Sequence, residues 1–268
     1  MTSMLDIIMA ASGLSDYGIC SFDAVADCLL PCLAKGRLPE EAKSIICVLF
    51  PYKVPMEKGN LSSYATVPDY HEIAGRMLTG VANALSKAFP PFEFVWFVDN
   101  SPIPEVYAAS LCGLGCIGDN HLLINKRYGS YCFIGTIVTS LEMPLTGSGK
   151  ISECQHCGRC VKSCPGGALC SDGSFCREKC LSAISQRKGA LTPEEINLLR
   201  KGGLVWGCDT CQDVCPMNVD AEYTYIAPFL QYANPNASIS GLATAKDRAY
   251  LYRGKAVVER NIRALEDE

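Results

Sequence analysis

The sequence lacks the long apolar run that a membrane-spanning helix needs. Such a helix takes about 20 consecutive apolar residues, and no stretch of the 268-residue chain reaches that length. The opening MTSMLDIIMAASGLSDYG also lacks the basic residues that precede the apolar part of a secretory signal. We therefore expect a cytoplasmic protein without a membrane partner.

Charge of either sign is sparse. Charged residues make up 19% of the chain and the formal net charge is -4, which argues against indiscriminate nucleic-acid binding. Residues 151–205 do carry a local excess, with eight Lys or Arg against five Asp or Glu, and this segment could serve a partner surface. With 49% hydrophobic residues, the chain can bury a full-sized core.

Cysteine, in contrast, is abundant, with 17 residues. Dense cysteines often form a disulfide scaffold, but that solution belongs to short secreted chains that cannot build a core. Since this chain can build one, metal or redox chemistry in a reducing compartment explains the thiols better.

The first 140 or so residues alternate helical and strand-like segments, which predicts an α/β or α+β domain. The runs SIICVLF (44–50) and EFVWFV (93–98) are short and rich in β-branched and aromatic residues, so we interpret them as buried strands. HLLIN (121–125) and YCFIGTIVT (131–139) are expected to pair across a turn at RYGS (127–130).

Four helices are expected. Residues 70–89 carry apolar side chains at helical spacing, and Asp69 is placed to cap the start of that helix. Shorter helices are predicted at 104–111 and at 193–201, the second with a proline in its first turn. Residues 255–265 form an amphipathic helix that we expect to pack on the body.

A glycine-containing linker, PLTGSGK (144–150), separates the two halves. We therefore divide the chain into an α/β reductase-like domain (1–145), a ferredoxin-like cluster domain (146–225) and a helical tail (226–268).

Two cysteine motifs carry the chemistry. The first matches the bacterial ferredoxin run in every spacing, in which three thiolates bind one cubane cluster and the fourth binds a second cluster. The second motif is shorter but also ends in Cys-Pro. The motifs are Cys154-x2-Cys157-x2-Cys160-x3-Cys164-Pro165 and Cys208-x2-Cys211-x3-Cys215-Pro216.

The cysteine count predicts two [4Fe–4S] clusters with crossed ligands. Cluster one takes Cys154, Cys157, Cys160 and Cys215, and cluster two takes Cys164, Cys208, Cys211 and one more thiol. Spacing alone leaves Cys170, Cys176 and Cys180 as candidates for that position. A pair of structural zinc sites is the alternative, but zinc gives no reason for the triple-cysteine run or for either Cys-Pro. Two neighbouring clusters conduct electrons, so a partner protein or a second redox centre must receive them.

The cysteine motifs and several upstream segments together resemble the epoxyqueuosine reductase family, cobalamin-dependent enzymes with two [4Fe–4S] clusters. The similarity extends from about residue 44 to the C-terminus. The segments that carry it are GCDTCQDVCPMN (207–218), SSYATVPDYH (62–71), FVDNSPIPE (97–105), CGLGCIGDNHLLINKRYGSYCFIG (112–135) and LYRGKAVVERNIRAL (251–265).

The resemblance implies a cobalamin-reductase-like N-terminal domain before the cluster domain. It selects Cys180 as the remaining ligand of cluster two. It also implies that Asp99 is the catalytic acid, with a pKa raised by burial beside the macrocycle. The alternative role for Asp99 is a strand-end carboxylate that caps the helix near Pro104.

Cofactor contacts are implied for the DYH triplet and the glycine-rich loop, namely Tyr70, His71, Gly113, Gly115 and Gly118. His71 could equally be a capping or solvated imidazole in the first turn of its helix. We expect electrons to come from a reduced ferredoxin or a flavodoxin-type donor.

This chain departs from the family pattern at Ser63 and Pro68, where basic residues are usual, and at Asp119, where a lysine is usual. Each change removes a charge that could hold an amide, a phosphate or an RNA backbone. The chain also ends at Glu268, before the extra C-terminal domain that the resemblance associates with tRNA. The leading hypothesis is therefore a reductase of a small or nucleoside-like substrate, and the alternatives are a non-catalytic electron-transfer protein and a tRNA-modifying reductase.

The remaining cysteines and histidines have simpler interpretations. Cys112 and Cys116 could form a redox pair, but buried packing is the more common role of free cysteine. His156 is expected to tune a cluster by hydrogen bonding, and His121 has no pattern that suggests zinc or a catalytic base. Five cysteines in apolar stretches are predicted to lie in the core: Cys20, Cys28, Cys32, Cys47 and Cys132.

Overall fold

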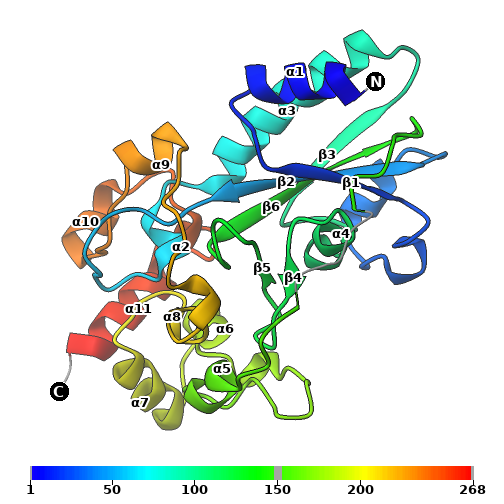
Figure 1. Ribbon diagram of the computed structural model, residues 1–268. Coiled ribbons are helices and arrows are strands. Elements are labelled where there is room, and N and C mark those ends of the chain that lie inside the picture. The colour runs from blue at the N-terminus through cyan, green and yellow to red at the C-terminus, as the bar shows by residue number, and fades with distance from the viewer. Residues whose placement is uncertain (1, 148–152, 267–268) are drawn as a thin grey trace.

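The computed structural model describes residues 2–147 and 153–266, and its centre is a four-stranded antiparallel sheet (Figure 1). The strand order is β1-β2-β6-β3. The strands are β1 (Tyr17–Ser21), β2 (Ser44–Pro51), β6 (Cys132–Thr139) and β3 (Phe94–Val98). Antiparallel pairing throughout makes this half an α+β domain, one of the two arrangements that the sequence predicts.

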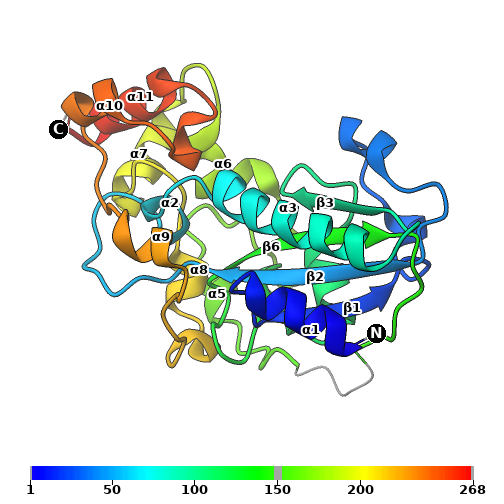
Figure 2. The ribbon, with the colours of Figure 1, turned by 90° about the horizontal axis from the view of Figure 1, so that it is seen from above.

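Helices cover both faces of the sheet. On one face lie α1 (Thr2–Ala11) and α3 (Tyr70–Ala88), which Figure 2 shows above the strands, and on the other lies α4 (Glu105–Leu111). Every residue of β2 is buried, because its alternate side chains enter two separate hydrophobic cores. An uninterrupted apolar run such as SIICVLF is what a strand covered on both faces requires.

The predicted strands at 44–50 and 93–98 are confirmed as β2 and β3. The predicted pairing of 121–125 with 131–139 is wrong. Residues Leu123–Ile124 (β5) pair with Cys116–Ile117 (β4), whereas β6 pairs with β2 and β3. A single bridge between Asn125 and Gly129 closes the turn. After the turn, β6 pairs with the apolar strands β2 and β3, which bury more of its apolar surface than the two-residue β5 could.

The four predicted helices are confirmed. The Asp69 carboxylate accepts a hydrogen bond from the backbone N–H of His71 and caps α3. Thr192 and Glu195 form a capping box at the start of α7 (Pro193–Gly202). The last helix, α11 (Lys255–Glu266), packs against α7 and α6 (Leu181–Gln186), as expected for a tail that docks on the body.

The cysteine-rich half contains short helices joined by irregular segments, and it lies beside one end of the sheet (Figure 1). Its remaining helices are α5 (Arg159–Ser163), α8 (Thr210–Asp213), α9 (Ala227–Gln231) and α10 (Ile239–Thr244), and α2 (Ser63–Thr66) reaches it from the N-terminal half.

Segments from both halves of the chain are interleaved. The backbone of Ser62 donates to the carbonyl of Trp206, and Asp69 donates to the carbonyl of Asp247. Trp206 is fully buried in a hydrophobic core that also contains Leu61 and Val258. The three-part division at 145 and 225 stays a prediction, and the predicted linker lies partly outside the described residues. Among the helices of residues 2–147 and 153–266, none is long and apolar enough to span a membrane.

Candidate functional site

A cavity of about 340 Å³ lies between the end of the sheet and the cysteine-rich half. Aromatic side chains from the N-terminal half form one wall, and thiols from the other half form the opposite wall. The lining includes Tyr52, Tyr64 and Phe133 on the first side and Cys164, Cys180, Cys208 and Cys211 on the second. The four thiols are the ones that the crossed arrangement predicts for cluster two.

The thiols of this wall are close enough to interact electrostatically. Burial raises the pKa of Cys211 to about 12, and the neighbouring thiols of Cys208, Cys180 and Cys164 contribute to the increase. Burial also raises the pKa of Cys208, with a contribution from Cys180. Free thiols in such a group resist ionisation, whereas a bound cluster would hold all four as thiolates.

The second set of thiols, away from this cavity, is also close together. Burial raises the pKa of Cys215, and Cys154 and Cys157 contribute. Cys160 has its pKa raised mainly by burial, again with Cys154 as a neighbour. Residues of the first motif therefore meet the last cysteine of the second motif, as expected for cluster one.

Local geometry explains how the first motif reaches the Cys180 segment. A side chain at Gly166 would collide with the carbonyl oxygen of Lys179, so glycine allows the turn after Cys164 to lie directly against that segment. The backbone N–H of Ala168 donates to the Cys164 sulfur at 3.2 Å, the type of contact that tunes a cluster thiolate.

The two other candidate ligands lie elsewhere. Cys170 and Cys176, both within the described part of the chain, do not line the cavity. They flank a short turn closed by a bridge between Leu169 and Phe175, and the Cys176 thiol contacts the carboxylate of Glu178. Their positions favour Cys180 as the eighth ligand.

Beside the aromatic wall, His71 lies between two carboxylates. Its Nδ1 is 2.7 Å from Oδ1 of Asp69, and its Nε2 is 3.2 Å from Oδ2 of Asp99. Tyr70 stacks on Phe133 with ring centroids 3.9 Å apart, and the Phe133 ring lines the cavity. The Asp99 side chain is 67% exposed and does not itself line the cavity.

The two carboxylates determine the charge of this group. Burial alone would lower the pKa of His71, but its bonds to Asp69 and Asp99 raise it to about 9, so the imidazole is cationic at neutral pH. The bond to His71 lowers the pKa of Asp99. The raised pKa expected for Asp99 is therefore not found in the cofactor-free chain, because the carboxylate is exposed and paired with a cation. Asp99 also does not cap α4, whose first turn has no side-chain cap.

Sequence reasoning missed Glu105, the first residue of α4. Burial and the neighbouring Asp99 raise the pKa of its carboxyl group to about 8, and its Oε1 is shielded from water without a hydrogen-bond partner. The available signal was an acidic residue in the first turn of a helix that is otherwise apolar, but acidic residues are common there.

The cavity fits a corrinoid in its chemistry. The aromatic side chains of Tyr52, Tyr64 and Phe133 line the cavity and suit an apolar macrocycle, and the buried Nδ2 of Asn120, also in the lining, has no acceptor among the described residues. A corrin ring carries peripheral amide groups whose oxygens could accept from this donor. Asn120 was not predicted from the sequence.

The three glycines with predicted cofactor contacts also have packing roles. Gly113 has a φ of 76° and adjoins the backbone of Gly147. A side chain at Gly115 or Gly118 would collide with Ile124 in β5. Their contact with a cofactor stays a prediction, because internal packing alone accounts for glycine at these positions.

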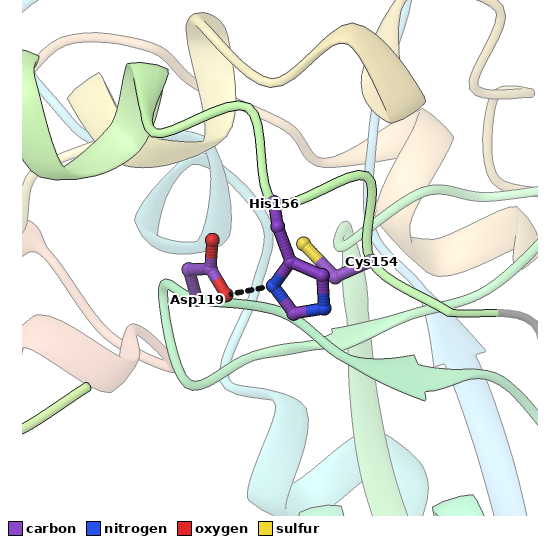
Figure 3. Close-up of side chains that lie close together, drawn as sticks. All are labelled: Asp119, Cys154 and His156. Atoms are coloured by element: carbon purple, nitrogen blue, oxygen red, sulfur yellow. Dashed lines mark hydrogen bonds and ion pairs between the residues drawn. The ribbon is translucent and has the colours of Figure 1, made fainter. Parts of the chain in front are cut away.

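The loop that contains Asp119 contacts the first cysteine motif (Figure 3). Nδ1 of His156 is 2.7 Å from Oδ1 of Asp119, and the Cys154 thiol lies close to both side chains. A metal ion would find three donor groups here, but Cys154 is already expected to bind cluster one. The Asp119–His156 bond therefore joins the two halves of the chain next to that cluster. At another departure from the family pattern, the Ser63 hydroxyl donates to Asp209.

The other cysteines mostly fit the packing interpretation. Cys112 and Cys116 are both buried, and Cys112 contacts Cys20 and Cys47 in the core below the sheet. The prediction for Cys28 is wrong, because this residue is exposed. Its apolar segment forms short 3₁₀ turns at the surface, where the side chain of Leu33 is also exposed. Cys32 and Cys132 are partly buried, and His121 packs against Phe175.

The sheet, the cavity and the two sets of thiols define an iron–sulfur oxidoreductase with a double [4Fe–4S] cluster domain. A family model described as a 4Fe-4S double cluster binding domain matches residues 153–218, and one described as Epoxyqueuosine reductase QueG, DUF1730 matches residues 35–100. The chain belongs to the epoxyqueuosine reductase family. It is 33% identical over 240 residues to the epoxyqueuosine reductase of Synechocystis sp., with 85% of this chain and 81% of the relative covered.

Other relatives are longer. The enzyme of Lactococcus garvieae is 32% identical over 242 residues, covering 83% of this chain and 68% of the relative, and the match to the Pseudomonas aeruginosa enzyme spans 55% of that protein. The solved epoxyqueuosine reductase of Streptococcus thermophilus shares the fold with a TM-score of 0.82 and 24% identity, covering 99% of this chain and 80% of that one. The reductive dehalogenase NpRdhA shares the fold more distantly, with a TM-score of 0.55 and 15% identity over 97% of this chain and 37% of that one.

Proposed function

We propose that the chain is a corrinoid-dependent reductase that acts on a modified nucleoside in tRNA. One observation carries this proposal: the cavity lined by the four thiols of cluster two is also lined by Phe133, and Tyr70 stacks on Phe133 next to the His71–Asp99 pair. Electrons could enter through the clusters, and a proton donor stands next to the opposite wall. The relatives from Lactococcus garvieae and Synechocystis sp. are epoxyqueuosine reductases, which supports the nucleoside substrate.

The eight cysteines are proposed to hold the clusters in the crossed arrangement. Cluster one is bound by Cys154, Cys157, Cys160 and Cys215, and cluster two by Cys164, Cys180, Cys208 and Cys211. Since the proposed ligands of cluster two line the cavity and those of cluster one do not, electrons would pass from cluster one to cluster two. A bound corrinoid would supply the cobalt centre that delivers them to the substrate. A ferredoxin or flavodoxin-type donor in the cytoplasm is the proposed source.

Asp99 and His71 are proposed to supply a proton. The cationic His71 carries a proton on each ring nitrogen, Nδ1–H toward Asp69 and Nε2–H toward Asp99, and the 3.2 Å contact allows the Nε2 proton to pass to the Asp99 carboxylate, which leaves a neutral imidazole. Asp99, being exposed, could pass that proton to a substrate oxygen. When a cofactor covers the pair and excludes water, the neutral acid form of Asp99 becomes more favourable.

Corrinoid binding tests the proposal directly. We expect anaerobically reconstituted protein that is incubated with cobalamin to retain about one corrinoid per chain after gel filtration, because the aromatic wall and Asn120 bind the macrocycle. The visible spectrum would then show corrinoid bands above the cluster absorbance. If the clusters remain but the corrinoid is lost, the non-catalytic electron-transfer alternative replaces the enzyme.

A second measurement tests the tRNA substrate. A neighbour of this fold, at 21% identity, was solved with an epoxyqueuosine-modified tRNA stem loop. We expect this chain to bind such a stem loop at least about 10-fold more tightly than the unmodified one in about 200 mM salt, since charge-only binding weakens steeply there. Equal affinities that both vanish in salt would contradict a specific site and indicate only the basic excess of residues 151–205.

A further inference from the structure

The segment that carries Asp99 has an unusual backbone. Asp99 directly follows β3 and has a φ of 59°, a conformation that non-glycine residues rarely adopt. The loop then continues through two local hydrogen bonds: Ser101 N–H donates to the Asp99 carbonyl at 2.8 Å, and Ile103 N–H donates to the Ser101 hydroxyl at 3.1 Å. Strained backbone of this kind persists only where surrounding contacts hold it.

Glu105 provides such contacts from the end of the loop. Its carboxyl group interacts with the backbone amide of Asp99 and with the hydroxyl of Ser101. Its Oε1 is shielded from water and has no hydrogen-bond donor among the residues that the structure describes, so this oxygen is not at the surface. Asp99 itself is exposed, and its side chain is fixed mainly through His71 and Tyr70. The backbone of the loop therefore needs an anchor, and Glu105 is in contact with it at two points.

We propose that Glu105 is a positioning residue for Asp99: its shielded carboxyl group holds residues 99–104 in the conformation that directs the Asp99 carboxylate toward Nε2 of His71. Only the effect of Glu105 on catalysis rests on the proposed reductase function. The positioning itself is a property of the chain without cofactors.

The charge of Glu105 matters for this role. The groups that face it are Asp99 and Ser101 from the loop, and Tyr70 and His71 from α3. With a pKa of about 8, its carboxyl group is mostly neutral at pH 7, so it supports Asp99 without adding a second negative charge. Above that pH it ionises, and the added charge favours the protonated form of His71.

Histidine-ring NMR of the full chain, with its clusters oxidised, tests the proposal without corrinoid or substrate. The chain has three histidines, so the His71 signal can be assigned by its loss in a His71→Gln variant. In Glu105→Ala we expect the pKa of His71 to fall by about 1, because Asp99 is no longer held against it. Glu105→Gln resembles the neutral acid, so it should abolish the extra inflection near pH 8. It should lower the His71 pKa by less than Glu105→Ala does, because it removes the Glu105 charge but keeps the support of Asp99.

Glu72→Ala is the matched control, because Glu72 is also an acidic residue in the first turn of a helix but is exposed. Glu72→Ala should shift neither the pKa of His71 nor the midpoint of the inflection near pH 8 by more than about 0.3. With a corrinoid and substrate present, Glu105→Ala should lower kcat at least about 10-fold with little change in KM, and Glu105→Gln should restore it.

An unchanged His71 pKa in Glu105→Ala overturns the proposal. If that variant does not fold, persistence of the inflection near pH 8 in Glu105→Gln overturns it instead. A shifted His71 signal together with a chain that binds no corrinoid would leave the positioning role intact and reject only the proposed function.

Discussion

Replacing Cys180 with serine is expected to remove the second cluster and lower the iron content from about eight to about four atoms per chain. Cys180 lines the cavity with Cys164, Cys208 and Cys211, and a cubane that keeps only three thiolates is open to solvent and loses iron. Iron and sulfide analysis after anaerobic reconstitution measures the loss. Electron paramagnetic resonance of the reduced protein should show one isolated cluster in place of two interacting ones.

The serine variants of Cys170 and Cys176 are the matched controls, because both cysteines lie in the same segment but away from the cavity. Each should keep about eight iron atoms. Should Cys180→Ser also keep eight, while one of these variants drops to four, the eighth ligand has been assigned to the wrong residue.

Replacing Asp99 with asparagine is expected to lower kcat by about 10²- to 10⁴-fold, the range for loss of a general acid. Asparagine can still contact Nε2 of His71, but it cannot carry a proton to the substrate. Iron content and corrinoid retention should be unchanged, because Asp99 is not among the residues that line the cavity with the thiols of cluster two. The assay uses a stem loop that carries epoxyqueuosine, with dithionite as the reductant. Activity within a few-fold of the wild type would remove Asp99 from the mechanism.

Asp69→Asn is the control for this variant, since Asp69 bonds the other ring nitrogen of His71. We expect less than about 10-fold loss of kcat there, together with a small loss of stability at the start of α3. The pH profile adds an independent check. Wild-type activity should fall as pH rises through about 9, where His71 loses its proton, and this alkaline limb should be absent from the residual activity of Asp99→Asn.

Cysteine spacing predicts the cluster domain well because each ligand is a specific residue type and the motif length is set by the size of the cubane. The structure adds the proximity of Cys180 to Cys164, which depends on the close approach of Gly166 to Lys179 and has no signal in either motif. Strands β2 and β3 and helix α3 were also predictable, since burial on both faces or on one face leaves a clear apolar pattern.

For the polar part of the site, the sequence predicts individual residues but not the contacts between them. Asp99 and His71 are 28 positions apart, on a strand end and in the first turn of a helix, and their contact depends on how α3 packs on the sheet. Glu105 was missed because its burial comes from the loop before it. The same limit explains the wrong pairing of β5, whose two residues are too few to specify a partner by pattern.

The interleaving of residues 58–69 with residues 205–250 also sets an order of events during biosynthesis. Ribosomes deliver the N-terminal half first, and domains usually fold as they emerge. Here the backbone of Asp69 has its partner at Asp247, and Leu61 has its neighbours at Trp206 and Pro235. The segment that carries Tyr64 of the cavity wall therefore cannot reach its final packing until the chain has been translated past residue 247. We expect the proposed ligands Cys180, Cys208 and Cys211 to receive their iron after that point.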